Sequence, residues 1–588
     1  MNYLIAILFT LISFAQDIDV PQQAPTERDP LFVELVRLAE NPLQVDTLNL
    51  YDQDLYKIHD LVFKFKNLKR LDLSNNSLRK IPLELTKLTK LEFLNLGSNH
   101  IIEIPSEISK LKNLKVLILN NNALTKLPDS IAELTQLEIL DLSKNSLTSV
   151  HNLGKLTKLQ HLNLRSNKFE KLDTKLPSKI QVLDLSFNRL SAFPMAIENC
   201  PKLKALLLNV NQLKAITAVG VTLPELSYLD LSSNSLSKLE MDWKKFKKLS
   251  YLNLNFNQLA DCPDLTKNHE LKELYLANNQ IIKMGKLPNS IVRLNLSKNK
   301  LVEIAAEFQQ LKNCKELNLS RNKISKLPEW FKDMESLEML NLNHCILTEV
   351  GQQFPAKLEK LLLKHNQINT LSVQIPSLKY LDLSENMLEK FTQDLIVSET
   401  LKTLDLRANP IHSISLNKKA SLQYLNLSNT RIHQLSNTMN HLAELRELNL
   451  GNCKIRSIAD DLELKDLKSI NLSSNQLKLF PSALFKSKRL SYLNLANNYI
   501  RVIPIKISKL HFIKHADLSG NKIKDIKALC ESRSIQYLYL QKNNFHSIPQ
   551  EIYQLRYIQV LHISKHKLHI TMDTLLHKQL PNIKIYYH

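Results

Sequence analysis

Three stretches of the chain share one pattern: LKRLDLSNN at residues 68–76, LEFLNLGSN at 91–99 and LKVLILNNN at 114–122. Each stretch matches LxxLxLxxN, and each begins 23 residues after the one before it. A pattern repeated at a fixed step indicates one structural unit per copy, so it takes precedence over a domain count based on length. We number the positions of a copy from its first Leu, which places the Asn at position 9.

The pattern continues through nearly the whole chain of 588 residues. The first copy, which starts at Val45, is degenerate, and a truncated copy at 580–588 follows the last full one. The mean step is about 22 residues, the length of a short supersecondary unit. The 24 full copies start at residues 45, 68, 91, 114, 137, 159, 180, 203, 226, 249, 271, 291, 314, 337, 358, 378, 401, 422, 445, 467, 490, 513, 535 and 558.

The spacing of the Leu residues predicts a short strand in each copy. Leu at positions 4 and 6 lie on one face of a strand, and the residue between them faces the other way. One coil cannot bury its Leu face alone, whereas stacked coils form a parallel sheet over a continuous core. Hydrophobic residues make up 44% of the chain and aromatic residues only 6%, so the predicted core is aliphatic.

Position 9 marks the point where the chain turns away from the strand. A buried turn leaves backbone groups unpaired, and an amide side chain can both donate to and accept from them. Nineteen of the 24 copies carry Asn there. The exceptions are Gln53, Cys345, Thr430, Cys453 and His566.

The second half of a copy predicts a short helical segment. Ile81, Leu85 and Leu88 have helical spacing, and Pro82 suits the first turn because its φ is fixed and it lacks an N–H donor. Other apolar–Pro pairs stand at Ile104-Pro105, Leu127-Pro128, Leu327-Pro328, Ile503-Pro504 and Ile548-Pro549.

These motifs resemble the leucine-rich repeat family, over about residues 31 to 588. The resemblance implies an α/β solenoid, a curved horseshoe or superhelix with a parallel sheet on its concave face and short helical or 3₁₀ segments on its convex face. The plain repeats are similar to those of exported bacterial proteins that lack cysteine-rich caps. All six cysteines fall on inward positions and are expected to be buried free thiols: Cys200, Cys262, Cys314, Cys345, Cys453 and Cys530.

The segments outside the repeats predict export. Residues 1–15 resemble a signal peptide, because Leu4 to Ala15 form an apolar stretch too short to span a bilayer. Residues 16–28 are interpreted as a linker and 29–44 as a helical N-terminal cap. The solenoid of 24 repeats occupies 45–579, and 580–588 is expected to end the sheet as an edge strand. The apolar face of the cap helix is predicted to carry Leu31, Phe32, Leu35, Val36 and Ala39.

The net charge of +21 favours anionic partners, although it also serves solubility. The variable positions of the predicted concave face are nearly balanced in charge, which argues against a specific nucleic-acid groove. A local basic patch remains there at Lys360, Lys364, His365 and Lys379. Most of the excess charge falls on the convex side and loops, where an acidic polymer is a possible partner.

Motifs for catalysis or cofactor binding are weak. The seven Gly residues are too far apart for a P-loop or a dinucleotide fingerprint. Asp or Asn is frequent at position 5, but this is the consensus of the repeat itself. His562, His566 and His569 lack nearby Cys or carboxylate partners for a metal. We therefore expect no cofactor, no metal and no enzymatic activity.

Exposed aromatic side chains are the best candidates for contact with a partner, because Tyr buries a large area at low entropic cost. Strands also favour Tyr without any binding role. Most candidates lie at positions 3 and 5, and Leu362 is included because it departs from Asp or Asn at position 5. The candidate residues are Tyr228, Tyr251, Phe256, Tyr275, Leu362, Tyr380, Tyr424, Tyr492, Tyr537 and Tyr539.

The sequence thus favours a monomeric, exported scaffold, periplasmic or secreted, that recognises a protein ligand on its concave face. One alternative is a surface adhesin for an acidic glycan or envelope polymer. Another is a cytoplasmic scaffold for signalling, similar to a phosphatase regulator, if the N-terminus is not a signal peptide. No stretch after residue 15 has transmembrane length.

Overall fold

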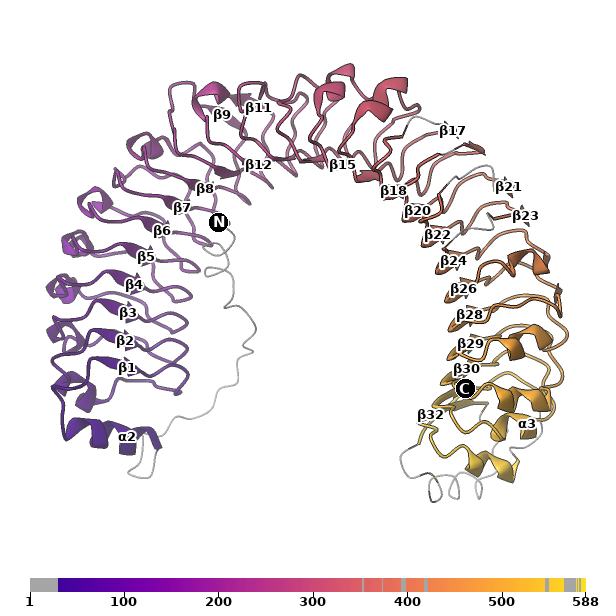
Figure 1. Cartoon of the computed structure of the whole chain (residues 1–588). Helices are drawn as coiled ribbons and strands as arrows, with labels where there is room; N and C mark the ends of the chain where they lie inside the picture. Colours follow the sequence, from indigo (N-terminus) through magenta and orange to yellow (C-terminus); the bar gives the residue numbers. More distant parts are fainter. Residues whose placement is uncertain are drawn as a thin grey trace. The chain divides into compact units, whose positions relative to one another are not determined.

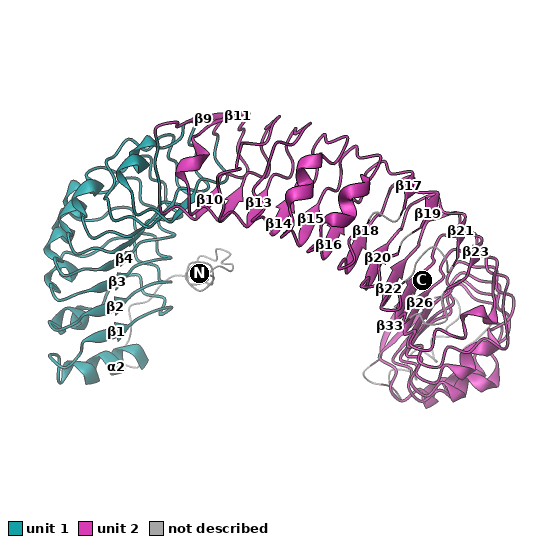
Figure 2. Cartoon of the chain, turned by 45° about the horizontal axis from the view of Figure 1, so that its top comes forward, with its two compact units in different colours: residues 1–212, 221–224 teal, residues 213–220, 225–588 magenta. Residues whose placement is uncertain are grey.

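The computed structural model describes residues 30–351, 354–372, 374–392, 398–416, 421–544, 549–564, 578, 580 and 583–588. The predicted signal peptide and linker, and two of the three C-terminal histidines, His566 and His569, lie outside these ranges. The chain divides into two compact units. Unit 1 comprises residues up to 212 together with 221–224, and unit 2 comprises 213–220 together with 225–588 (Figure 2).

Each copy of the repeat contributes a short strand at positions 3 to 5, as predicted, and within each unit neighbouring strands pair in parallel (Figure 1). Equal positions lie opposite each other: Leu71 pairs with Leu94, and Leu94 with Leu117. The strands of unit 1 are β1 (Thr47–Asn49), β2 (Arg70–Asp72), β3 (Phe93–Asn95), β4 (Val116–Ile118), β5 (Ile139–Asp141), β6 (His161–Asn163), β7 (Val182–Asp184) and β8 (Ala205–Leu207).

The same arrangement runs through unit 2, where the truncated copy supplies the last strand, β33, which pairs with β32. These strands are β10 (Tyr228–Asp230), β12 (Tyr251–Asn253), β13 (Glu273–Tyr275), β14 (Arg293–Asn295), β15 (Glu316–Asn318), β16 (Met339–Asn341), β18 (Lys360–Leu362), β20 (Tyr380–Asp382), β22 (Thr403–Asp405), β24 (Tyr424–Asn426), β26 (Glu447–Asn449), β28 (Ser469–Asn471), β29 (Tyr492–Asn494), β30 (His515–Asp517), β31 (Tyr537–Tyr539), β32 (Val560–Ile563) and β33 (Lys584–Tyr587).

The core consists of the Leu residues that define the repeat. Leu91, Leu94 and Leu96, at positions 1, 4 and 6 of one coil, have no exposed surface, and the same positions are buried throughout both units. Five of the six free thiols are buried as predicted. The exception is Cys262, which is half-buried.

The Asn at position 9 binds three backbone groups from two coils. The Nδ2 of Asn322 donates to the carbonyl oxygens of Leu319 (2.8 Å) and Leu296 (3.0 Å), and its Oδ1 accepts from the N–H of Leu301 (3.0 Å). Asn99 and Asn475 make the same contacts in their own coils. The amide ladder therefore satisfies backbone groups that the turn removes from the sheet, as its residue type predicts.

The exceptions at position 9 keep part of this function. Thr430 donates its hydroxyl to the carbonyl of Leu427 (2.8 Å), and the Cys453 thiol lies 2.9 Å from the same oxygen. The Cys345 thiol makes a longer contact, 3.6 Å, with Leu319. None of these side chains carries an amide, so none combines the two N–H donors and the carbonyl acceptor that Asn supplies.

The residue before the amide has left-handed backbone in most coils. Asn75, Lys144, Arg321 and Asn452 have φ between 52° and 57°, although only Gly520 at this position is a glycine. A non-glycine residue is strained by roughly 1 kcal/mol there. The ladder on the next residue holds this conformation in place, which explains why the chain needs so few glycines.

On the opposite side of the coils most segments are 3₁₀ helices, one of the two predicted forms. Pro105, Pro128, Pro328, Pro504 and Pro549 each stand immediately before such a helix. The helical segments are η1 (Asp60–Lys64), η2 (Leu85–Lys87), η3 (Ser106–Lys110), η4 (Asp129–Glu133), η5 (Leu153–Lys155), η6 (Met195–Asn199), η7 (Trp243–Lys245), η8 (Ala306–Gln310), η9 (Glu329–Asp333), η11 (Asn437–Met439), η12 (Ser482–Lys486), η13 (Ile505–Lys509), η14 (Gln550–Gln554) and a short α-helix, α3 (Lys527–Cys530).

Some coils of unit 2 carry short parallel strand pairs on this side, which the sequence analysis does not predict. In three of these coils the residue at the Pro82 position permits the pairing. Ser372, Ser415 and Ala459 stand there and donate their N–H groups to the preceding coil at 2.8–3.0 Å, a bond that Pro cannot make. The pairs are β9 (Ala215–Thr217) with β11 (Lys238–Glu240), β17 (Glu349–Val350) with β19 (Thr370–Leu371), β21 (Lys390–Phe391) with β23 (Ser413–Ile414), and β25 (Gln434–Leu435) with β27 (Ser457–Ile458).

One longer helix, α2 (Pro30–Ala39), precedes the first strand and lies in the range 29–44 where a helix is expected. It buries Leu35, and the Phe32 ring meets the His59 ring edge-on at 5.3 Å. Val36, expected on the apolar face, is 42% exposed. None of the described helices combines the length and the apolar character required to cross a membrane.

Substitution of one ladder amide tests its contribution to stability. We expect Asn322→Ala to lower the free energy of unfolding by about 2–4 kcal/mol, because buried donors and acceptors of two coils lose their partner. Asn313→Ala is the control, since that exposed amide makes a single bond, to the carbonyl of Asn289 (3.1 Å). Urea denaturation followed by circular dichroism measures both, and equal effects would contradict the role of the ladder.

Candidate binding surface

The side chains that can reach a partner from the sheet stand at positions 3 and 5. They point away from the core, and their exposure alternates with the buried Leu at position 4, as in Tyr251, Leu252 and Asn253. We call this surface the strand face. It is made of rigid strands, so its side chains are held at the spacing of neighbouring coils, about 4.8 Å.

Many Asp and Asn side chains at position 5 serve the backbone. Asp141 Oδ1 accepts from the N–H of Ser143 (2.9 Å), and Asn295 Oδ1 accepts from that of Ser297 (3.0 Å). Burial raises the pKa of Asp141, although the hydrogen bonds from Ser143 oppose this rise. Such local bonds terminate the strand and leave the carboxylates in a structural role.

The first predicted aromatic group comes together on β10, β12 and β13. The rings of Tyr228 and Tyr251 stack with centroids 4.2 Å apart and an interplanar angle of 5°, and the ring of Tyr275 lies 5.4 Å from that of Tyr251 at 45°. All three side chains are half-buried. Burial raises the pKa of Tyr251 far above its usual value, and the neighbouring Tyr228 adds to this. We call these three residues the tyrosine cluster.

A charged pair fixes one end of the tyrosine cluster. The Tyr275 hydroxyl donates to Glu273 Oε2 at 2.7 Å, and Arg293 on β14 forms an ion pair with the other carboxylate oxygen. Burial raises the pKa of Tyr275 to about 12, and the bond to Glu273 adds to this effect. Glu273 and Arg293 were not among the predicted residues, although both occupy position 3 of consecutive copies.

Two other predicted residues do not join this group. Phe256 follows β12 at position 8, where its φ is 56°, so it lies in the turn and is 55% exposed. Leu362 is half-buried on β18, between Asn341 and Asp382 of the neighbouring strands. Tyr380 and Tyr424 stand at position 3 of β20 and β24, with Thr403 between them in register.

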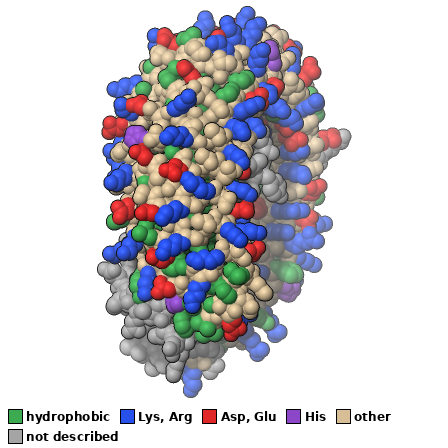
Figure 3. All heavy atoms as spheres, turned by 90° about the vertical axis from the view of Figure 1, so that its left-hand side faces the viewer, with side chains coloured by type: hydrophobic (Ala, Val, Ile, Leu, Met, Phe, Trp, Pro, Cys, Tyr) green, Lys and Arg blue, Asp and Glu red, His purple; other side chains and the backbone are tan. Residues whose placement is uncertain are grey.

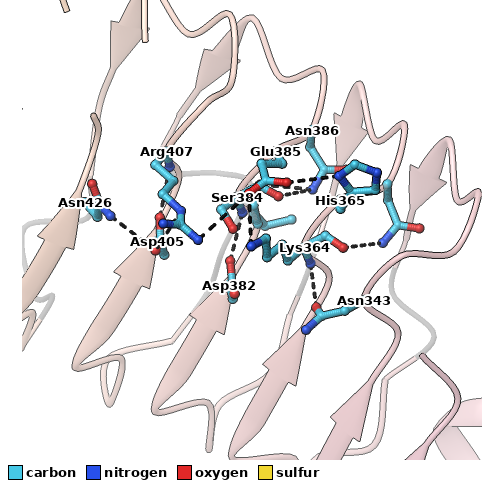
Figure 4. A network of polar contacts seen from close by, with 12 residues as sticks. Asn343, Lys364, His365, Asp382, Ser384, Glu385, Asn386, Asp405, Arg407 and Asn426 are labelled. Atoms are coloured by element: carbon cyan, nitrogen blue, oxygen red, sulfur yellow. Dashed lines mark hydrogen bonds and ion pairs between the residues drawn. The ribbon is translucent and has the colours of Figure 1, made fainter. Parts of the chain in front are cut away.

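Three of the four residues of the predicted basic patch pair with carboxylates of neighbouring coils. Glu385 accepts from Lys364 Nζ and His365 Nδ1, both at 3.0 Å, and Arg407 approaches it at 3.9 Å (Figure 4). The bonds from His365 and Lys364 lower the pKa of Glu385. Lys379 pairs with Glu359 at 2.6 Å. Lys360, the fourth residue, lies over the Tyr380 ring at 5.2 Å, so the patch keeps only part of the positive charge expected from the sequence.

A second aromatic group occupies the end of unit 2, in two parallel columns. His515 lies between Tyr492 and Tyr537 and stacks on Tyr537 at 4.2 Å. In the adjacent column His562 stacks on Tyr539 (4.5 Å) and also on Tyr586 of β33 (4.6 Å). The histidines and Tyr586 were not among the candidates. His515 at position 3 and His562 at position 5 could have been identified from the repeat, whereas the register that places Tyr586 opposite His562 comes from the structure. Burial lowers the pKa of His515, which favours a neutral ring at neutral pH.

Groups suited to metal binding or nucleophilic chemistry are not brought together in the part of the chain that the structure describes. No cluster of three or more His, Cys, Asp or Glu residues could hold a metal ion there. Burial raises the pKa of Cys200 to about 11 and that of Cys314 to about 12. Thiols of this kind are poor nucleophiles at neutral pH.

On the face shown in Figure 3, Lys and Arg are spread over the surface with Asp and Glu between them.

Comparison with known proteins identifies the repeat. A family model described as "Leucine-rich repeat region" matches residues 44–167, and one described as "Leucine rich repeat" matches 289–347. No curated protein sequence matches the chain.

Three solved structures are similar in fold. YopM from Yersinia enterocolitica has a TM-score of 0.61 and 24% identity, over 84% of this chain and 96% of YopM. The plant receptor RGFR1, in complex with RGF2, has a TM-score of 0.55 and 24% identity, over 93% and 86%. The Arabidopsis receptor kinase HAESA, in complex with the peptide hormone IDA and the co-receptor SERK1, has a TM-score of 0.50 and 25% identity, over 90% and 89%.

The carboxylate beside the tyrosine cluster should make stability depend on pH. Burial raises the pKa of Glu273, but the hydrogen bonds from Arg293 and Tyr275 outweigh this and leave it lowered. A lowered carboxyl pKa stabilises the fold above the unfolded pKa, about 4.3, and this contribution is lost as pH falls through the folded pKa. We expect Glu273→Gln to reduce the loss of stability between pH 5 and pH 3 by about 0.5 kcal/mol, because the pair is partly exposed. Denaturation midpoints of both proteins measure it, and parallel pH profiles would contradict it.

Proposed function

Because the chain is a leucine-rich repeat protein, we propose that it is a non-enzymatic scaffold that recognises a protein or peptide ligand on its strand face. The observation that carries the proposal is the tyrosine cluster. Tyr228, Tyr251 and Tyr275 form a contiguous aromatic surface on three adjacent strands. Each ring carries a hydroxyl group, and the hydroxyl of Tyr275 is hydrogen-bonded to the carboxylate of the adjoining ion pair. Aromatic side chains held in one conformation bind partners at a low entropic cost.

The chemistry of the rest of the strand face supports recognition rather than catalysis. Asp and Asn at position 5 cap their own backbone, and the buried thiols have raised pKa values. Surfaces rich in Tyr, Asn and Ser are typical of protein recognition, because Tyr supplies rigid contact area and Asn and Ser supply adaptable hydrogen bonds. HAESA, which is similar in fold, is seen with a peptide hormone, and a peptide ligand is one form that the proposal takes.

The binding role of the tyrosine cluster can be tested without knowledge of the natural ligand. Peptides would be selected from a random display library on the full wild-type chain, and their affinities measured by biolayer interferometry. We expect the double variant Tyr251→Ala with Tyr275→Ala to weaken the selected peptides at least about tenfold, because each ring is a candidate hot spot. Thermal melting would verify that the variant remains folded.

The matched control is Tyr557→Ala, which removes a Tyr that is 64% exposed and lies outside the strands. Its binding should equal that of the wild type. Selected peptides that bind the double variant and the wild type equally would overturn the proposal for this cluster.

We also propose that the protein is exported, on the basis of the apolar stretch from Leu4 to Ala15. Expression in a Gram-negative host, with fractionation and intact mass, tests this. The expected product begins at Gln16 and is found in the periplasm or medium. A product of full mass in the cytoplasm would contradict export and favour a scaffold inside the cell.

A further inference from the structure

Seven Lys and Arg side chains gather on one flank of unit 2, away from the strand face. They occupy positions 10 and 12, just after the turn amide, on the five consecutive coils that start at residues 422 to 513, and all seven are exposed. We call them the basic flank: Arg431, Lys454, Arg456, Lys478, Arg501, Lys522 and Lys524.

This charge is not a property of the repeat consensus. The three coils that start at residues 337, 358 and 378 carry no Lys or Arg at the same two positions. Their residues there are Ile346, Thr348, Gln367, Asn369, Met387 and Glu389.

The backbone holds the basic flank as a fixed array. The N–H of Arg456 donates to the carbonyl of His433 (3.0 Å), and that of Lys522 donates to the carbonyl of Ile500 (2.9 Å). A weaker bond of 3.4 Å joins Lys524 to Arg501. Bonds between neighbouring coils fix the spacing of the charges at roughly that of strands, about 4.8 Å.

The positive charges of the basic flank are available to a ligand. Among the described residues, none of the seven forms an ion pair. Arg456 Nε donates to the neutral Gln476 (3.2 Å), and Lys522 lies over the Tyr499 ring at 5.2 Å. This contrasts with Lys364 and Lys379 on the strand face, which are paired with carboxylates.

A polar hollow of about 220 Å³ opens on the coils that start at residues 422, 445 and 467, among residues at positions 5, 7 and 8 of the repeat, which precede the positions of the basic flank in the chain. It is centred on Gly451, where an added Cβ would come within 3.1 Å of Asn471 Nδ2. It is lined only by hydroxyl, amide and glycine residues: Ser428, Asn429, Asn449, Gly451, Asn452, Asn471, Ser473 and Ser474.

Donors in the hollow are left for a ligand. Asn449 and Asn471 each use Oδ1 to accept from the N–H two residues later, at 3.1 and 3.0 Å. Their Nδ2 groups and the Ser473 hydroxyl donate to no acceptor among the described residues. Asn429 and Asn452, on the rim, stand two positions before Arg431 and Lys454 of the basic flank.

From these two features together we propose that this flank of unit 2 binds a linear carboxylated polysaccharide. Sugar hydroxyls would meet the free amide and hydroxyl donors around Gly451, and the carboxylates would pair with the basic flank. Arg431, Arg456 and Arg501 can each form the two parallel bonds that a planar carboxylate accepts. Tyr499 and His433 are the two residues with aromatic rings at these positions. They stand three coils apart and Lys522 lies over the Tyr499 ring, so the surface lacks the continuous stacking platform typical of single-stranded nucleic-acid binding.

Binding of a labelled oligogalacturonate to the full chain, followed by fluorescence anisotropy at low salt, tests the proposal. Its fully methyl-esterified form is the matched ligand control, because it keeps the rings and loses the charges. We expect the acid to bind and the ester to bind at least about tenfold more weakly, with an affinity that falls as salt rises. Equal binding of the two forms, or no binding of the acid, would overturn the proposal.

The variant Arg456→Gln, Lys478→Gln, Arg501→Gln removes three charges from consecutive coils and should weaken the acid about tenfold. The control variant Lys283→Gln, Lys300→Gln, Lys323→Gln removes the same charge from exposed sites on other coils of unit 2 and should leave affinity within about twofold of the wild type. Equal losses in the two variants would reduce the binding to net charge and overturn the assignment of the site.

The hollow is tested separately by Gly451→Gln, which fills it without a change in charge. We expect about a fivefold loss of affinity for the oligogalacturonate, because the amide donors become inaccessible. Full affinity in this variant would overturn the role of the hollow. A thymidine oligonucleotide of equal charge that binds as tightly as the acid would overturn the choice of polysaccharide.

This inference does not depend on the proposed function. The double variant Tyr251→Ala with Tyr275→Ala should bind the oligogalacturonate as the wild type does. Failure of one proposal would therefore leave the other standing.

Discussion

The amide at position 9 is the interaction on which the rest of the structure depends. Asn322 joins three backbone groups of two coils, and comparable bonds recur in coil after coil of each unit. Without them, the turn that follows each strand would bury unpaired donors and acceptors, and the strained residue at position 8 would lose its support. The Leu core provides the hydrophobic stabilisation, but the ladder permits such short coils to stack.

A repeated coil has a consequence for binding. Because neighbouring coils place equal positions side by side, any residue type that recurs at one position becomes a column on the surface. Tyr at position 3 of two copies produces the stacked rings of Tyr228 and Tyr251, and Lys or Arg at positions 10 and 12 of five copies produces the basic flank. The tyrosine cluster and the basic flank occupy different positions of the repeat on different coils, so each can bind its partner independently of the other.

The candidate site was predictable where it depends on register. The contact of Tyr251 with Tyr228 and Tyr275 follows from their positions in consecutive copies. Register alone did not reveal that Lys364 and His365 share Glu385, because that contact depends on side-chain directions in a turn. Phe256 lies in a turn and not on a strand, because its backbone at position 8 is left-handed.

The sequence by itself determined the repeat, the strand positions, the aliphatic core and the role of the amide, because each depends on a local pattern that every copy must satisfy to stack. Only the tertiary structure decided which charges are free and which are paired, and where Gly451 leaves a hollow. It also showed that some coils without Pro pair on the helical side, as at Ser415 and Ala459. These outcomes depend on contacts between side chains and backbone of different coils, about 20 residues apart in sequence, which a pattern within one copy does not contain.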